Sequence, residues 1–169
     1  MSSNTIVSEL IAETYGPEEA QRHLSSEISR ADRERAEEAG DVVLTRSRVA
    51  SRFCIYLSAM WTAILRDVFS LPAYCVTGDL RVRGQLVFGS SDPMVARTPG
   101  ISNEQWDAHC WLVLGPYLGD ASIFRTAYAQ SDRSNLKQAI VEQFGLGCGL
   151  MLMRDPEWLA EGFPVCQHG

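Results

Sequence analysis

The sequence predicts an α+β domain in which N-terminal helices and a central helix pack on an antiparallel β-sheet. Residues 4–39 and 48–69 carry apolar side chains at helical spacing. From residue 71 onward, short apolar or alternating segments bounded by Gly and Pro are typical of strands. Helices followed mostly by strands favour an α+β fold over alternating β-α units.

The composition fits one folded domain over residues 1–169, with 46% hydrophobic and 21% charged residues. Fifteen basic and 21 acidic residues give a net charge of -6, and no basic run offsets it. Nucleic acid is therefore not expected as a partner. Because no uncharged apolar run approaches the ~20 residues of a membrane helix, no membrane partner is expected either.

The five cysteines are an odd number without a C-x-x-C pair, and the N-terminus lacks the features of a signal peptide. Both observations favour a cytoplasmic protein. No cofactor or metal is expected. The "GLGCG" stretch lacks the context of a dinucleotide fingerprint, and Cys166 with His168 supplies too few metal ligands.

The N-terminal region, residues 1–46, is predicted to be helical with a break at Gly16-Pro17. The second helix, from residue 17 to 39, is expected to end at Gly40. About half of its residues are charged, so we expect a surface helix with His23 in solvent, or a contact with another chain that allows a homodimer. Its thin apolar stripe consists of Leu24, Ile28 and Ala31.

The central helix, about residues 48–69, has a wide apolar surface, and Ser47 or Ser51 could cap it. Residues 71–89 have strand character, and 89–100 form a loop. Two strands, "AHCWLVL" and "YLGDAS", are expected to join at Gly115-Pro116. "SNLKQAIVEQFG" is predicted to be a helix and "CGLMLM" a short strand.

A histidine on this apolar hairpin is the main functional signal. Alternation along a strand separates His109 from Cys110, so Cys110 is a poor nucleophile for that histidine. If the hairpin turns at residues 115 and 116, paired positions sum to 231. Asp120 is then diagonal to His109 on the same face.

A His-Asp pair is half of a nucleophilic site, because the carboxylate orients the imidazole that ionises a thiol. Cys54 and Cys75 are the upstream choices for that thiol. Cys54 lies early in the central helix, where the helix N-terminus favours a thiolate. Neighbouring arginines at positions 46, 48 and 52 act in the same direction, whereas Cys75 lies on a strand without such help.

The order of these residues resembles the transglutaminase-like core of the papain-like superfamily. The matches are Cys54 with Ala63 and Leu65 on the helix, "LPAYCVTGDL" at 71–80, "HCW" from His109, and Asp120. They cover about residues 48–124, within a core that we delimit as 47–128. Residues 129–169 add a helix, a strand and a tail. The chain departs from the family at Tyr74, where an arginine is common, and in the "GDASIF" context of the aspartate.

The resemblance implies acyl transfer through a thioester at Cys54, with His109 as base and then acid, and Asp120 as its orienting group. The substrate would be an amide, ester or thioester, and the acceptor would decide between hydrolase and acyltransferase. Trp106 and Trp111 flank His109 and are candidates for substrate contacts. No oxyanion donor is evident upstream of Cys54.

Other interpretations remain open. A cysteine on an apolar helix is usually a small core residue, and a strand histidine is often only hydrogen-bonded. Asp120 could be a turn residue, and both tryptophans could be core. The alternative function is therefore a catalytically silent binding domain on the same scaffold, and a third is a structural oligomer subunit.

Overall fold

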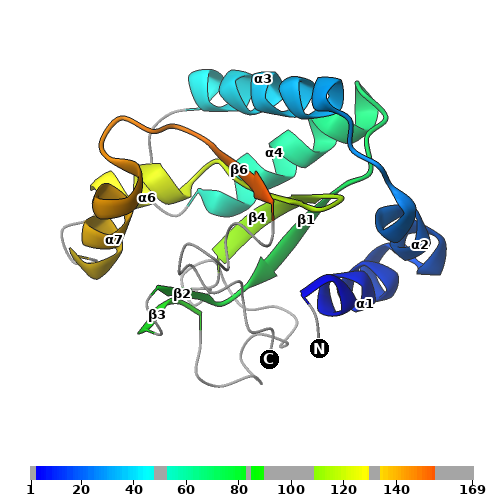
Figure 1. Ribbon diagram of the computed structural model, residues 1–169, viewed down its shortest axis with the longest axis horizontal. Coiled ribbons are helices and arrows are strands. Elements are labelled where there is room, and N and C mark those ends of the chain that lie inside the picture. Colours follow the sequence, from blue (N-terminus) through cyan, green and yellow to red (C-terminus); the bar gives the residue numbers. More distant parts are fainter. Residues whose placement is uncertain (1–2, 48–52, 83–84, 90–108, 130–133, 155–169) are drawn as a thin grey trace.

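A four-stranded antiparallel sheet lies at the centre of the computed structural model, which describes residues 3–47, 53–82, 85–89, 109–129 and 134–154 (Figure 1). In spatial order its strands are β1 (Ala73–Gly78), β4 (His109–Leu114), β5 (Tyr117–Asp120) and β6 (Met151–Arg154), and a separate hairpin pairs β2 (Leu80–Val82) with β3 (Gln85–Phe88). The helices are α1 (Ser3–Tyr15), α2 (Pro17–Ser25), α3 (Arg30–Arg46), α4 (Cys54–Asp67), α6 (Ile123–Ala129) and α7 (Ser134–Phe144). The predicted α+β class is confirmed.

Each face of the sheet carries its own apolar layer, because side chains alternate along the strands. On one face, α4 packs on the sheet and α3 lies over α4 (Figure 1). This layer includes Leu57, Trp61, Leu65, Ala73, Leu112 and Leu114. The other layer joins the sheet to α1, α6 and α7, and includes Ile11, Tyr74, Trp111, Val113, Ile123 and Ile140.

Trp61 on α4 packs against both α3 and β5. Its indole Nε1 donates a hydrogen bond to the carbonyl oxygen of Ala36 on α3 at 2.8 Å. A Cβ atom at Gly119 on β5 would lie 2.7 Å from carbons of the Trp61 ring. A Cβ at Gly40 would lie 2.8 Å from the Leu150 side chain. Glycine therefore permits the close packing of α3 and the sheet around α4.

The charged N-terminal segment differs from the prediction. Two helices, α2 and α3, occupy the region where one helix was expected over 17–39. A capping box formed by Ser29 and Asp32 begins α3. Gly40 does not end the second of these, which continues to Arg46. Leu24 is 54% exposed and Ala31 is exposed, as expected of a surface stripe, whereas Ile28 is partly buried against the layer that contains Trp61. The buried side of α3 instead contains Ala36, Ala39, Gly40, Val43 and Leu44.

The strand predictions agree better with the structure. Leu112 pairs with Gly119 and Leu114 with Tyr117, so the predicted register about Gly115 is confirmed. The predicted C-terminal helix corresponds to α7, and the short strand to β6. The β2–β3 hairpin and α6 were not anticipated. Within the described residues, no helix is long and apolar enough to cross a membrane.

Candidate functional site

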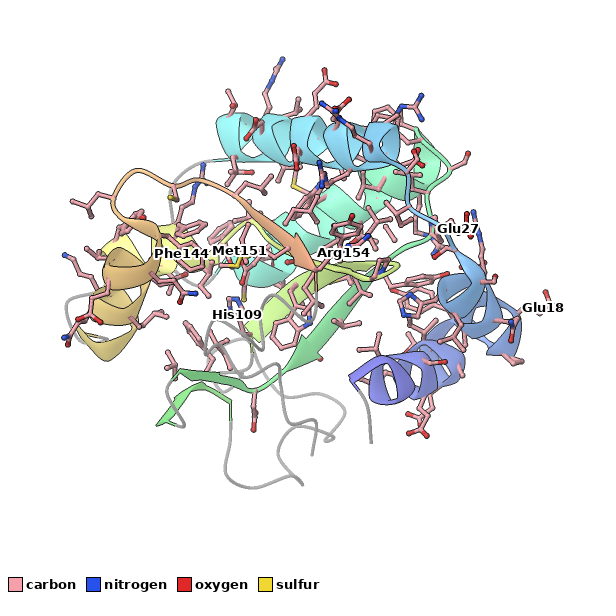
Figure 2. The ribbon with its side chains drawn as sticks, in the orientation of Figure 1. Glu18, Glu27, His109, Phe144, Met151 and Arg154 are labelled. Atoms are coloured by element: carbon pink, nitrogen blue, oxygen red, sulfur yellow. The ribbon has the colours of Figure 1, made fainter. Side chains whose placement is uncertain are left out.

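The three predicted catalytic residues each lie at the end of an element. Cys54 is the first residue of α4, His109 is the first of β4 and Asp120 is the last of β5. Because β4 and β5 are antiparallel, the start of one lies beside the end of the other. Figure 2 marks His109 at this end of β4. The fold thus brings the imidazole and the carboxylate to one end of the sheet.

His109 and Asp120 form a buried pair. The distance between His109 Nε2 and Asp120 Oδ2 is 2.5 Å, and the two side chains are 1% and 0% exposed. Their diagonal arrangement follows from the register about Gly115. The prediction that the two side chains share a face and meet is therefore confirmed, whereas their catalytic roles stay predictions.

The second carboxylate oxygen of Asp120 is held by the start of α6. Oδ1 accepts hydrogen bonds from the Ser122 N–H at 2.7 Å, the Ser122 hydroxyl at 2.9 Å and the Ile123 N–H at 2.9 Å. Burial alone would raise the pKa of Asp120. The charge and hydrogen bond of His109, together with the Ser122 donors, outweigh burial and lower that pKa. Asp120 is therefore a fixed anion.

The His109 ring lies between two aromatic side chains. Its centroid is 5.0 Å from that of Phe88, in a stacked arrangement, and 5.7 Å from that of Trp111. Burial would lower the pKa of His109. The charge and hydrogen bond of Asp120 oppose burial more strongly and, with a smaller effect of Cys54, raise the pKa to about 10. The imidazole is thus held in place and charged near neutral pH.

Cys54 lies near the His109 ring. Nδ1 is buried and has no aligned hydrogen-bond partner among the described residues. Yet the Cys54 thiol is close enough for hydrogen bonding and charge to couple the two groups. Since Nε2 is occupied by Asp120, Nδ1 is the nitrogen that can act on Cys54. In unliganded sites, catalytic hydrogen bonds are often long or poorly aligned.

The pKa of the Cys54 thiol is lowered into the range of reactive cysteines. The Cys54 side chain is buried, and Cys54 is the first residue of α4, where the backbone N–H groups have no partner within the helix. A hydrogen bond from the Cys110 thiol is the main cause that lowers the pKa of Cys54. Burial opposes this, and hydrogen bonding and charge from His109 add to it, which gives a pKa of about 5. Arg46 is not among the causes, and residues 48–52 lie outside the described part.

The thiols of Cys75 on β1 and Cys110 on β4 lie on the face of the sheet that α4 covers, near Cys54. Cys110 lies opposite Thr77, and Cys75 lies opposite Leu112, so these two cysteines are diagonal on one face. Hydrogen bonds to Cys54 and to Cys75, and then burial, raise the pKa of Cys110. The prediction that Cys110 points away from His109 agrees with its place on the face of β4 that α4 covers. Among the described residues, no group of three or more His, Cys, Asp or Glu side chains has the geometry of a metal site.

The structure describes only one of the two residues predicted to contact the substrate, Trp111. Trp111 is 4% exposed and belongs to the apolar layer beside α6, where its ring also supports His109. Its contact with a substrate stays a prediction. Trp106 lies outside the described residues, as do Cys166 and His168.

Two parts of this site were missed from the sequence. The "DAS" segment before an apolar run is a helix-start signal that would have identified Ser122 as a partner of Asp120. Cys110 was dismissed because it points away from His109. Only the packing of α4 over that face shows that its thiol can influence the pKa of Cys54.

Comparisons of the chain with models of protein families, with curated proteins and with solved structures found no match. The resemblance to the transglutaminase-like core therefore stays a prediction.

Proposed function

We propose that this protein is a cysteine enzyme, a hydrolase or acyltransferase, that forms a thioester at Cys54. The observation that carries the proposal is the buried His109–Asp120 pair, whose remaining ring nitrogen is coupled to a thiol at a helix N-terminus. This arrangement combines a nucleophile, a base and an orienting carboxylate in the order that acyl transfer requires. The resemblance to the transglutaminase-like core supports the same chemistry.

In the proposed first step, the Cys54 thiolate attacks the carbonyl carbon of an amide, ester or thioester. The negative charge moves to the carbonyl oxygen, and the backbone N–H groups of the first turn of α4 are candidate donors to it. The intermediate collapses to a Cys54 thioester as His109 Nδ1 gives its proton to the leaving group. Asp120 holds the ring throughout.

In the second step, water or another nucleophile attacks the thioester carbonyl, and His109 takes the proton that this acceptor loses. The acyl product leaves, and the Cys54 thiolate is restored beside the imidazolium. The free state of the four described cysteines also supports a reducing, cytoplasmic location as part of the proposal.

The test is alkylation of the native protein by iodoacetamide near pH 6, with each labelled cysteine identified by mass spectrometry. A thiol with a pKa of about 5 is roughly nine-tenths ionised there, against well under about 1% for a free thiol of ~8.5. Cys54 should therefore label much faster than Cys148. In His109→Ala, that advantage should fall sharply, and circular dichroism would confirm that the variant is folded.

Acyl transfer itself is tested with p-nitrophenyl acetate as the probe. Wild type should release p-nitrophenol with a burst and carry a hydroxylamine-sensitive acetyl group on Cys54, whereas Cys54→Ser should not. Fast alkylation without an acetylated intermediate would count against the enzyme and favour the silent binding domain. Slow alkylation of Cys54 in both proteins would contradict the ionised thiol itself.

A further inference from the structure

The cysteines beside the proposed nucleophile have no part in acyl transfer, yet the fold aligns one of them with Cys54. The Ser58 hydroxyl on α4 donates to the carbonyl oxygen of Cys110 at 3.0 Å, so α4 is fixed over this point of β4. Cys54 lies four residues before Ser58, on the same face of the helix. The Cys110 side chain points to that face, as those of Leu112 and Leu114 do, so it lies toward Cys54, and each thiol shifts the pKa of the other.

Cys75 is placed less well for a reaction with Cys54. It is diagonal to Cys110 across the β1–β4 ladder and hydrogen-bonds with it. Cys54 acts on the pKa of Cys75 through charge alone, and Cys75 is not among the causes that shift the pKa of Cys54. Cys110 therefore lies between the other two sulfurs and is the direct neighbour of the proposed nucleophile.

We propose that Cys54 and Cys110 are a reversible redox pair, which closes to a disulfide after a peroxide oxidises Cys54. The proposal rests on the proposed function only for the ionised thiol, and not on acyl transfer. The Cys54 sulfur attacks one oxygen of hydrogen peroxide, the O–O bond breaks, and the hydroxide released takes a proton to become water. Cys54 is now a sulfenic acid, oxidised by two electrons.

The Cys110 sulfur then attacks the Cys54 sulfur. The S–O bond breaks, and the departing hydroxide accepts the Cys110 proton and leaves as a second water. The disulfide occupies the nucleophile and protects it from irreversible oxidation to the sulfinic acid. A dithiol reductant restores both thiols by exchange.

The experiment treats the full chain with hydrogen peroxide in the presence and absence of dimedone, which traps sulfenic acids. Remaining thiols are blocked with iodoacetamide before mass-spectrometric mapping. Wild type should give a Cys54–Cys110 crosslink that dithiothreitol reverses, with little dimedone adduct. Cys110→Ser should give several-fold more dimedone adduct on Cys54 and more sulfinic acid. Cys75→Ser, the matched control, should behave like wild type.

The proposal is overturned if wild type accumulates the Cys54 dimedone adduct as strongly as Cys110→Ser and forms no crosslink. A Cys75–Cys110 crosslink in place of the Cys54–Cys110 one would overturn it as well. Because the crosslink is measured in the wild type, this part of the test does not depend on whether a variant folds. Rapid alkylation of reduced Cys54 near pH 6 without a crosslink would sink the redox pair alone. Failure of Cys54 to alkylate would instead contradict the ionised thiol on which the proposed function depends.

Discussion

Two buried histidines of this protein have opposite electrostatic environments. His109 is 1% exposed and His23 is 3% exposed. Burial lowers the pKa of His23, whereas the pKa of His109 is raised to about 10. The difference is the carboxylate, because Asp120 contacts His109 directly. Burial by itself thus favours a neutral imidazole, and only a fixed anion converts a buried histidine into a charged one.

The nearest carboxylate to His23 along α2, that of Glu19, pairs with other residues. Glu19, one turn earlier on α2, accepts hydrogen bonds from the Tyr74 hydroxyl at 2.9 Å and from Arg66 at 3.1 Å. The His23 ring meets the edge of the Tyr74 ring, and its Nδ1 has no hydrogen-bond partner among the described residues. His23 is therefore a packed core residue, contrary to the prediction that it is in solvent.

The largest effect is expected from Asp120→Asn, which would make His109 resemble His23. The change removes the anion from a buried pair, so we expect a loss of about 3 kcal/mol in the free energy of unfolding. The pKa of His109 should fall from about 10 to below its ordinary value. Urea denaturation and NMR titration of the ring measure both quantities.

The control for this variant is Asp67→Asn, at the exposed last residue of α4. It should change stability by less than about 0.5 kcal/mol. A His109 pKa that stays high in Asp120→Asn would mean that another anion, such as the Cys54 thiolate, charges the ring.

The second prediction concerns the pH dependence of stability. In the folded protein, Cys54 and His109 together hold one proton between pH values of about 5 and 10. In the unfolded chain they hold two protons below about 6.5, one up to about 8.5 and none above. Their contribution should be constant between about pH 6.5 and 8.5. It should be lost as pH falls toward 5 or rises toward 10.

Cys54→Ser should change that profile. The folded variant keeps the proton on His109, whereas the unfolded chain loses it above about pH 6.5. Relative to wild type, its stability should therefore fall by about 2 kcal/mol between about pH 6.5 and 8.5. Urea midpoints across this range test it, and Cys148→Ser should track wild type. Parallel profiles for Cys54→Ser and wild type would mean that the folded thiol is not ionised near pH 7.

The same two histidines show what the sequence could predict. His109 and Asp120 lie on strands joined at Gly115-Pro116, where alternation and a short turn determine the pairing. His23 lies on a charged helix whose buried residues, Ala20 and His23 itself, give almost no apolar signal. His23 packs against Tyr74, which is fifty-one residues away in the sequence. Local periodicity could not predict this burial, because it reports only on neighbouring residues.

A smaller effect is expected from Ser122→Ala. The change removes one of three donors to Asp120 Oδ1 and leaves the two backbone N–H groups in place. We expect a loss of about 1 kcal/mol, because the buried carboxylate loses a donor, and no fall in the His109 pKa, because Asp120 stays ionised. Ser25→Ala, at an exposed position of α2, is the control and should be near neutral. An unchanged stability would show that the backbone donors suffice.

The last prediction has the opposite sign, because His23→Leu should stabilise the protein. The change removes a buried polar atom without a partner, so we expect a gain of about 1 kcal/mol at pH 7. Because burial lowers the pKa of His23, the unfolded wild type takes up a proton that the folded protein resists. The advantage of the variant should therefore grow as pH falls below about 6.5. Acid denaturation of wild type, His23→Leu and the exposed control Gln21→Leu tests this directly. If His23→Leu proved more sensitive to acid than wild type, His23 would have to be charged and paired, and its contrast with His109 would disappear.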